Sequence, residues 1–311
     1  PLISAWRTAS GFPDLLAVAL CLGFAGASFA VALPLAGRWY PAEHQGLAMG
    51  IAAAGNSGTV IAAFFAPRFA EVFGWRGVFG LAMIPVSVVL ALFYFLARES
   101  PSRPAPRQLA QYLTLAAEPD TWWFSLLYMV SFGGFVGLAS FLPIFFSDQY
   151  GASRIAAGNL TALSVFAGSF ARPVGGYLAD RVGGIRLLTV LFGVIGALYL
   201  AVAALPPLPL LVPLIFVIMS GLGIGNGAVF QLVPQRFGRD LGLATGLVGA
   251  AGGLGGFLLP SLIGGFRDWS GSYSTGFILF AAAAMSASAL LVAVERGWRR
   301  EWARDDLEVA F

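Results

Sequence analysis

The run Leu241–Phe266 reads LGLATGLVGAAGGLGGFLLPSLIGGF, 26 residues without a single charged side chain. A helix needs about 20 predominantly apolar residues to cross the hydrocarbon core of a bilayer. The run is therefore long enough and apolar enough to be a membrane helix.

Similar runs cover most of the chain. Ile155–Ala179 contains one charge, Arg172, and the long uncharged run Leu187–Gln235 is divided in two by prolines at positions 206, 207 and 209. Each resulting run can cross a bilayer as one helix. The sequence thus predicts nine membrane helices, of which the remaining uncharged runs are Leu15–Gly37, Gln45–Pro67, Gly77–Ala97, Thr121–Ser147 and Trp269–Val294.

Composition supports an all-α integral membrane protein. Hydrophobic residues make up 58% of the 311 residues and charged residues only 11%, against about 25% charged in soluble domains. One cysteine, Cys21, excludes a disulfide scaffold. The 18 basic residues are all Arg and lie in short clusters between apolar runs, so nucleic acid is not expected as a partner.

The distribution of arginine predicts the orientation. Counted on alternate sides of the nine helices, 12 Arg lie on one side and five on the other, with Arg172 inside the membrane. Cytoplasmic loops carry the excess of basic residues, so the Arg-rich side, including the C-terminus, is predicted to be cytoplasmic. All eight Trp lie at or just beyond the ends of the runs, as expected at the headgroup level.

An internal repeat suggests how the helices are grouped. Gly46–Gly50 reads GLAMG and Gly242–Gly246 reads GLATG, at an offset of 242 − 46 = 196 residues. The helix before each copy repeats more weakly. The repeat thus matches the first three predicted helices with the seventh, eighth and ninth. Three helices, the fourth to the sixth, precede the later set, and none precedes the earlier set. We therefore expect a six-plus-six parallel repeat whose first three helices are missing here; the alternative is chance similarity of Gly- and Ala-rich helices.

This grouping divides the chain into four parts. Residues 1–97 are expected to be the second half of an N-terminal six-helix bundle, and residues 121–294 a C-terminal six-helix bundle. Residues 98–120, in which Pro101, Pro104 and Pro106 lie close together, are a predicted cytoplasmic linker with a short interfacial helix over Gln108–Ala117. Residues 295–311 are a predicted cytoplasmic tail.

Arg172 is the strongest functional signal. An Arg at the centre of a membrane helix costs roughly 2.5–3.5 kcal/mol on insertion scales and is tolerated where it faces a cavity or a partner. Its planar guanidinium offers five donors and no acceptor, so its natural ligand is an oxyanion. The alternative is an Arg that snorkels to the interface or pairs with an acid in the missing helices.

Glycines form stripes on two helices. Gly242, Gly246, Gly249, Gly253 and Gly256 recur every four or three residues, and Gly46, Gly50, Ala54 and Gly58 do the same in the earlier copy. Such stripes let helix backbones approach closely. We expect close, moving contacts there, so that Gly253→Leu would abolish the activity of the protein. Helix packing alone and a direct ligand role both stay open for these glycines.

A few other residues could contribute to a site. Asn56 and Asn226 are amides in apolar helices, where they either join helices or line a path. Phe29, Tyr128 and Phe132 lie mid-membrane, with Tyr128 and Phe132 on one face at i, i+4. No membrane run contains Asp or Glu, and no Ser/His/Asp, Cys/His or metal-ligand cluster is present. We therefore expect no enzyme, no cofactor and no metal.

Four segments resemble a known family. Gly175–Gly184, GGYLADRVGG, is similar to the cytoplasmic loop motif of the major facilitator superfamily. Gly23–Phe29 with Gly46–Gly58 resembles the first signature of its nitrate/nitrite porters, and Gly249–Pro260 resembles the second. Phe170–Pro173, which contains Arg172, resembles the substrate-binding Arg helix of these porters.

The resemblance implies a fold and a site. The fold is twelve helices in two bundles, nine of them present here, with nitrate or nitrite bound between the bundles. Arg172 would bind the anion, Tyr128, Phe132 and Phe29 would stack on it, and Asn56 would lie close. Family members use a second Arg, which falls before Pro1. Gating and packing positions would be Gly46, Gly50, Gly55, Gly58, Gly246, Gly249, Gly253, Gly256, Asp180 and Arg181.

Three functions stay open. The first is a nitrate/nitrite antiporter or uniporter in a bacterial inner membrane. Its expected partners are the nitrate and nitrite anions and the surrounding lipid, and it is expected to be a monomer. The second is a proton-coupled facilitator of another small anion, such as a monocarboxylate or formate. The third is a membrane sensor that no longer transports.

The predicted topology can be tested by labelling. With Cys21 replaced, single cysteines at Ser153 and Arg236 should react from opposite sides of intact cells, because an odd number of predicted helices separates them. A membrane-impermeant maleimide measures this. Labelling of both positions from the same side would contradict the helix count.

Overall fold

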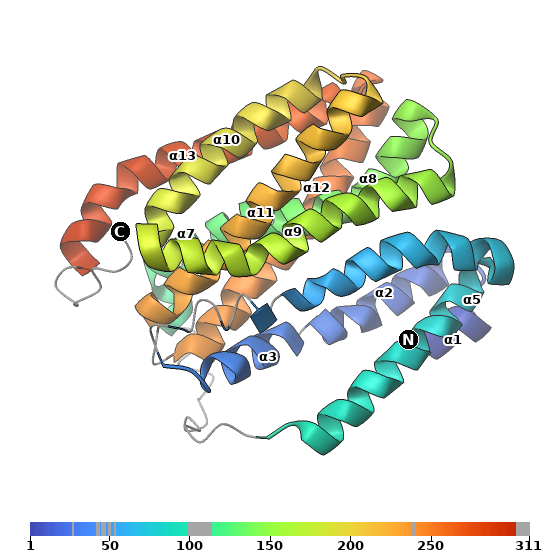
Figure 1. The fold of residues 1–311 in the computed structure, drawn as a ribbon, viewed down its shortest axis with the longest axis horizontal. Helices are drawn as coiled ribbons and strands as arrows, with labels where there is room; N and C mark the ends of the chain where they lie inside the picture. Colours follow the sequence, from blue (N-terminus) through green and yellow to red (C-terminus); the bar gives the residue numbers. More distant parts are fainter. Residues whose placement is uncertain are drawn as a thin grey trace.

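The computed structural model describes residues 1–26, 28–41, 44, 48, 51–52, 54–98, 114–237 and 240–302. Over these residues the regular structure is helical (Figure 1). The elements are α1 (Leu2–Arg7), α2 (Phe12–Gly26), α3 (Ser28–Gly37), η2 (Ala54–Ser57), α5 (Gly58–Leu96), α7 (Pro119–Tyr128), η3 (Met129–Gly133), α8 (Gly134–Tyr150), α9 (Arg154–Val182), α10 (Gly184–Ala203), α11 (Leu208–Phe237), α12 (Leu241–Ser270) and α13 (Ser274–Trp302).

Helix covers the described part of each predicted membrane run, with differences at the boundaries. α2 and α3 share the first run. α5 contains the end of the second run and the third run as far as Leu96. The chain reverses direction within this element, at Gly74 (Figure 1). Gly74 has φ 68°, a left-handed conformation that favours glycine. The two runs were expected to end at Pro67 and begin at Gly77, so the loop between them is shorter than predicted.

By length and composition alone, six described helices are long and apolar enough to cross a membrane. α2 and α3 are each too short, and Gly55–Leu96 is one continuous stretch across the kink. α9 is long enough, with 29 residues, but Asn159 and Arg172 make it less apolar. The six are Gly55–Leu96, Pro119–Tyr150, Gly184–Ala203, Leu208–Phe237, Leu241–Ser270 and Ser274–Glu295. The chain is a multi-pass membrane protein.

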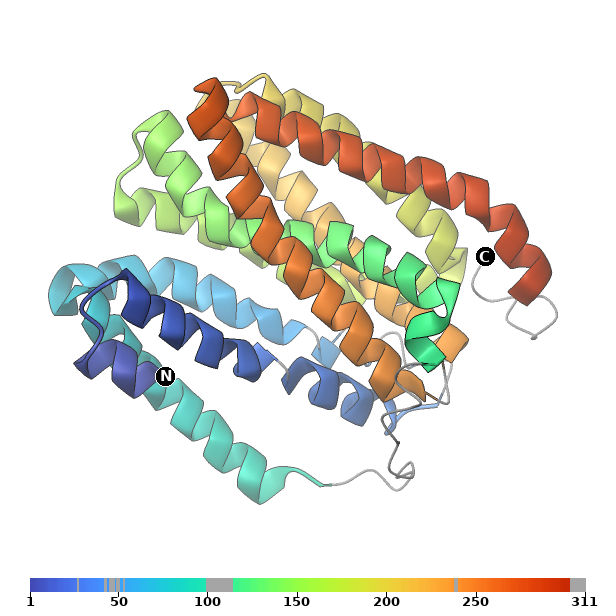
Figure 2. The same ribbon diagram turned by 180° about the vertical axis from the view of Figure 1, so that it is seen from behind.

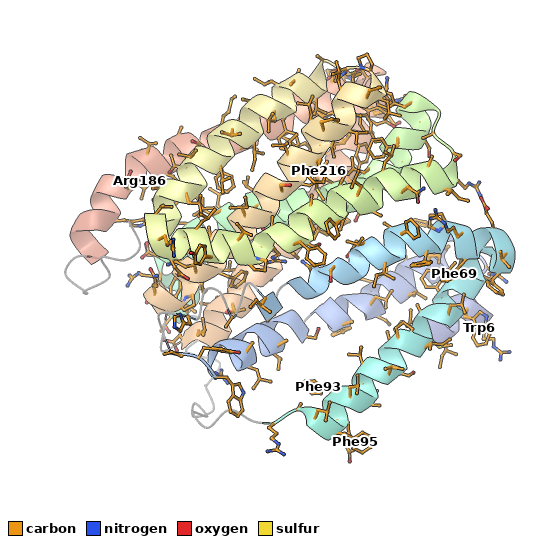
Figure 3. The ribbon with its side chains drawn as sticks, in the orientation of Figure 1. Trp6, Phe69, Phe93, Phe95, Arg186 and Phe216 are labelled. Carbon is orange, nitrogen blue, oxygen red and sulfur yellow. The ribbon has the colours of Figure 1, made fainter. Side chains whose placement is uncertain are left out.

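The helices form two groups that lie side by side. α1, α2, α3 and α5 make the first, and α7 to α13 make a compact second bundle in both views (Figures 1 and 2). The second bundle holds most of the buried apolar residues. The first leaves a large apolar face open, which includes Phe93 and Phe95 of α5 (Figure 3). A face of this kind needs apolar surroundings, such as lipid or further helices.

Glycines bring α9 and α11 into direct backbone contact. A Cβ atom built on Gly223 of α11 would lie 2.0 Å from the carbonyl oxygen of Gly168 in α9. A Cβ on Gly227 would lie 2.2 Å from the carbonyl oxygen of Arg172. No larger residue fits at either position without moving a backbone, so these glycines fix the height of Arg172 relative to α11.

The predicted linker lies mostly outside the described residues. Residues 114–117 are helical, whereas the rest of the predicted helix Gln108–Ala117 is among the residues that are not described. The end of the segment is tied to the second bundle, because Thr121 donates a 2.7 Å hydrogen bond to the carbonyl of Leu115. Asp120 pairs with Arg236 of α11 and accepts a 3.0 Å hydrogen bond from Trp298 of α13. These contacts join three helices at the Arg-rich end.

The packed face of α12 differs from the predicted glycine stripe. Gly253 is exposed, and a Cβ there would meet no described atom within 4 Å. Close contacts are made instead by Gly252 and Gly255, whose added Cβ atoms would lie 2.5 Å from the ring of Tyr128 and 2.6 Å from Met129. Gly256 belongs to both faces and would meet Val136 at 3.1 Å.

The expectation of close packing at Gly253 is therefore wrong for this conformation. The residues of α12 that face η3 are Gly252 and Gly255, and Gly253 of the predicted stripe lies beside that face. Gly55 and Gly58 are also open at Cβ within the described residues. Gly246 and Gly249 are half-buried. Gly46 and Gly50 lie outside the described residues.

We expect Gly255→Leu to lower the melting temperature of the purified protein and Gly253→Leu to leave it nearly unchanged. Overpacking of a tight helix contact typically costs about 1–3 kcal/mol, whereas an open position accepts the larger side chain. A thermal shift assay in detergent compares the two variants with wild type. Equal melting temperatures for the two would contradict the assigned face of α12.

Candidate anion site around Arg172

Arg172 lies inside the second bundle with no exposed surface. Its Nη2 atom donates a 3.0 Å hydrogen bond to the hydroxyl oxygen of Tyr128. Its guanidinium carbon lies 5.4 Å from the centre of the Phe132 ring. A cation over an aromatic face is stabilised by about 0.5–2 kcal/mol, more when it is shielded from water. The structure thus brings together three of the five residues expected at the site.

The two aromatic residues form a stacked pair, here called the aromatic wall. The rings of Tyr128 and Phe132 stack at a centroid distance of 4.8 Å and an interplanar angle of 3°. Tyr128 ends α7, and Phe132 belongs to η3, a π-helical turn that continues into α8. A π-helical turn is rare and is frequently found at functional sites. The guanidinium of Arg172 is in direct contact with both residues, so planar hydrogen-bond donors and a flat aromatic face meet at one place.

Phe230 of α11 completes the aromatic cluster and was not predicted. Its ring meets the ring of Tyr128 edge to face, with centroids 4.8 Å apart and an interplanar angle of 87°. This contact locks the orientation of the Tyr128 ring from the side of α11. A single Phe in an apolar helix carries no periodic or chemical signal, which is why the sequence did not single it out.

The other predicted site residues come from the first group of helices. Asn56 lies in η2, which packs against α9, the helix that carries Arg172. Its amide nitrogen is buried and has no hydrogen-bond partner among the described residues. Phe29 lies in α3, but its side chain is outside the described part of the structure. For these two residues a place at the site remains a prediction.

Asp180 and Arg181 lie near the C-terminal end of α9, beyond Arg172 along the helix. Asp180 is half-buried, and Arg181 is exposed with its guanidinium carbon 4.4 Å from the ring centre of Tyr177, one turn back on the same helix. A gating role for either is a prediction that these contacts leave open.

A separate cleft of about 930 Å³ lies between α5 and the α8–α9 corner, at the end opposite the Arg-rich loops. Its charged lining residues are Glu71, Asp148 and Arg154. Arg172, Tyr128 and Phe132 do not line it. Across the described residues, no group of three or more His, Cys, Asp or Glu could hold a metal ion.

Comparison with known proteins identifies the class. The family model of the Major Facilitator Superfamily matches residues 2–260 and 126–301. The crystal structure of the E. coli fucose:proton symporter FucP (N162A) matches with a TM-score of 0.65 at 17% identity, covering 85% of this chain and 73% of that one. The proton:xylose symporter XylE matches with a TM-score of 0.63 at 16% identity, covering 84% and 66%. These structures show the shared fold.

Curated relatives are more similar in sequence. The probable nitrate/nitrite antiporter NarK1 of Thermus thermophilus is 34% identical over 89% of this chain and 70% of its own length. The nitrite extrusion protein of Bacillus subtilis is 31% identical over 90% and 71%. The probable nitrate/nitrite transporter NarK2 of Mycobacterium tuberculosis is 34% identical over 90% and 72%.

The chain belongs to the Major Facilitator Superfamily, and within it to the nitrate/nitrite porter family. This membership confirms the predicted fold class and the prediction that the protein is a transporter rather than an enzyme.

The hydrogen bond between Tyr128 and Arg172 gives a stability prediction. Tyr128→Phe should lower the melting temperature, because hydrogen bonds to charged groups contribute about 1.5–3 kcal/mol. Tyr150→Phe is a matched control, since its hydroxyl donates only to the neutral carbonyl of Pro206 at 2.9 Å. A Tyr128→Phe protein as stable as Tyr150→Phe would mean that the bond to Arg172 contributes little.

Proposed function

We propose that the protein transports nitrate and nitrite across a bacterial inner membrane by alternating access, with the anion bound by Arg172. The names of the relatives support the substrates, since those proteins are described as nitrate/nitrite transporters or antiporters and a nitrite extrusion protein. The site supports the chemistry. The single observation that carries the proposal is a fully buried arginine beside a flat aromatic wall.

The charge and shape of the site fit a small planar oxyanion. The two contacts of Arg172 described above, the Tyr128 hydroxyl and the Phe132 ring, are both neutral. Neither of these two groups carries a negative charge, and an anion would be strongly attracted to the guanidinium in a low-dielectric interior. The guanidinium can donate two parallel hydrogen bonds to two oxygens of nitrate or nitrite. The flat ring of Phe132 matches the flat face of the ion.

The place of α9 in the fold supports alternating access. α9 belongs to the second bundle and also packs against η2 and α5 of the first group. Arg172 therefore lies on a helix at the boundary between the two groups (Figure 1). In transporters built from repeats, substrate sites lie at this boundary, and rocking of one bundle against the other exposes the site to each side in turn.

The proposal includes an orientation and an assembly state. The Arg-rich end, with the C-terminus, faces the cytoplasm, as the excess of Arg on that side supports. The protein acts as a monomer. Asn56 and Phe29 approach the anion from the first group of helices, as in the family pattern that the sequence resembles.

The test of this function is nitrate uptake by the intact protein with Arg172 replaced. Arg172→Lys should lose uptake nearly as completely as Arg172→Ala, because a point ammonium cannot reproduce the planar, two-pronged donor geometry. Arg186→Lys is the control, since Arg186 is exposed at the start of α10 (Figure 3) and should transport normally. Uptake is measured with labelled nitrate and nitrite in proteoliposomes, normalised to protein content.

Two outcomes would contradict the proposal. Wild-type uptake of formate or acetate without uptake of nitrate or nitrite would reject the substrate class. Normal nitrate uptake by Arg172→Lys would reject the role of Arg172 while leaving the transport function in place.

A further inference from the structure

Arg68 of α5 contacts both groups of helices at the boundary between them. Its Nη2 atom donates a 2.9 Å hydrogen bond to the amide oxygen of Asn159 in α9. Its Nη1 atom donates to the carbonyl oxygen of Phe64, and its guanidinium carbon lies 3.9 Å from the centre of the Phe64 ring. The guanidinium is thus held on its own helix by Phe64 and reaches the second bundle through Asn159.

Beside this hydrogen bond, the two helices come into very close contact. A Cβ atom built on Gly158 of α9 would lie 2.6 Å from the carbonyl oxygen of Ala63 and 2.8 Å from Cγ of Pro67, both in α5. No side chain fits at this position unless the helices move apart. The first part of α5 runs alongside α9 (Figure 1). Gly158 therefore permits the approach that brings Arg68 within reach of Asn159.

These contacts lie toward the end of the molecule opposite the Arg-rich loops. Asn159 precedes Arg172 by 172 − 159 = 13 residues, which is about 20 Å along α9 at about 1.5 Å per residue. At the Arg-rich end the two groups also meet, because α3 packs against α12. A path that reaches Arg172 between the groups from the Ser153 end would therefore pass the contact between Arg68 and Asn159.

We propose that Arg68, Asn159 and Gly158 form a latch that holds this end of the boundary closed and opens once in each transport cycle. The inference rests on the proposed function, because alternating access requires the two groups to separate at each end in turn. The chemistry suits a contact that must break. Asn159 is neutral and half-buried, so water can replace it as the acceptor, whereas a buried ion pair would be costly to separate.

The first experiment measures opening of the latch without substrate. In the intact protein with its cysteines replaced, Ala162→Cys places one thiol at a buried position of α9, one turn deeper than Gly158 on the same face. A membrane-impermeant maleimide added from the Ser153 side should reach this thiol only when the latch is open. Asn159→Ala should raise the labelling rate about tenfold, equivalent to about 1.4 kcal/mol in the equilibrium between the closed and open ends.

Three further variants make this measurement specific. Asn159→Asp keeps an acceptor for the guanidinium and adds a charge, so it should label at the wild-type rate or more slowly. Gly158→Ala should label faster, because its Cβ would collide with the carbonyl oxygen of Ala63. Ser164→Ala is the matched control and should label as wild type, since the 2.9 Å hydrogen bond from Ser164 to Leu160 lies within α9.

The effect of Asn159→Ala must also depend on Arg68. In an Arg68→Ala background, which should itself label faster, Asn159→Ala should add no further increase, as expected for two partners in one contact. The proposal would be overturned if Asn159→Ala labelled at the wild-type rate, if Asn159→Asp labelled as fast as Asn159→Ala, or if the effect persisted unchanged without Arg68. Absence of labelling in every variant would overturn it as well.

The second experiment tests whether the latch must open for transport. Arg68→Cys and Asn159→Cys are combined in the intact protein with its other cysteines replaced, and the two thiols are joined by a short cross-linker that a reductant cleaves. Cross-linking should abolish nitrate uptake in proteoliposomes, and reduction should restore it. Each single-cysteine protein, treated in the same way, should keep the uptake that it had before treatment.

The two experiments separate the latch from the proposed function. Full uptake by the cross-linked protein would overturn the latch, because the boundary would then not need to open between Arg68 and Asn159. A wild-type protein that does not transport nitrate would instead reject the proposed function, and the labelling rates would still decide whether these residues hold the end closed.

Discussion

The structure depends on one constraint, a guanidinium inside an apolar helix bundle. A guanidinium has only hydrogen-bond donors, so the surroundings of Arg172 must supply hydrogen-bond acceptors or a counter-ion. The hydroxyl of Tyr128 and the ring of Phe132 meet part of this need without neutralising the charge. The glycines of α11 bring that helix against the backbone of Arg172 and so fix where the guanidinium lies.

The aromatic wall links Arg172 to several neighbouring helices. Tyr128 packs on Gly252 of α12 and against Phe230 of α11, and it is followed by the π-helical turn η3. Tyr128, which bonds the guanidinium, therefore contacts several elements of the second bundle at once. α9 carries the same group at the boundary with η2 and α5. In the proposed mechanism, anion binding and the relative position of the two helix groups would be connected through these contacts.

The sequence predicted the helices, the family and the grouping of Arg172 with Tyr128 and Phe132, because each has a strong signal. Long uncharged runs identify membrane helices, and Arg172 is the one charge within them. The phase of α12 could not be predicted, since glycines at 252, 253, 255 and 256 occupy adjoining faces and only packing selects one. The π-helical turn also has no sequence signal, and it shifts the side chains that follow it. Phe230 and the reversal at Gly74 emerged only from tertiary contacts and backbone geometry.

The most direct test of the account is a high-resolution structure of the intact protein with nitrate. The account predicts planar density against the Phe132 ring, with oxygens within hydrogen-bonding distance, about 3 Å, of the Arg172 guanidinium. Nitrate bound elsewhere, such as in the cleft beside Arg154, with Arg172 still in the contacts described above, would contradict the central claim.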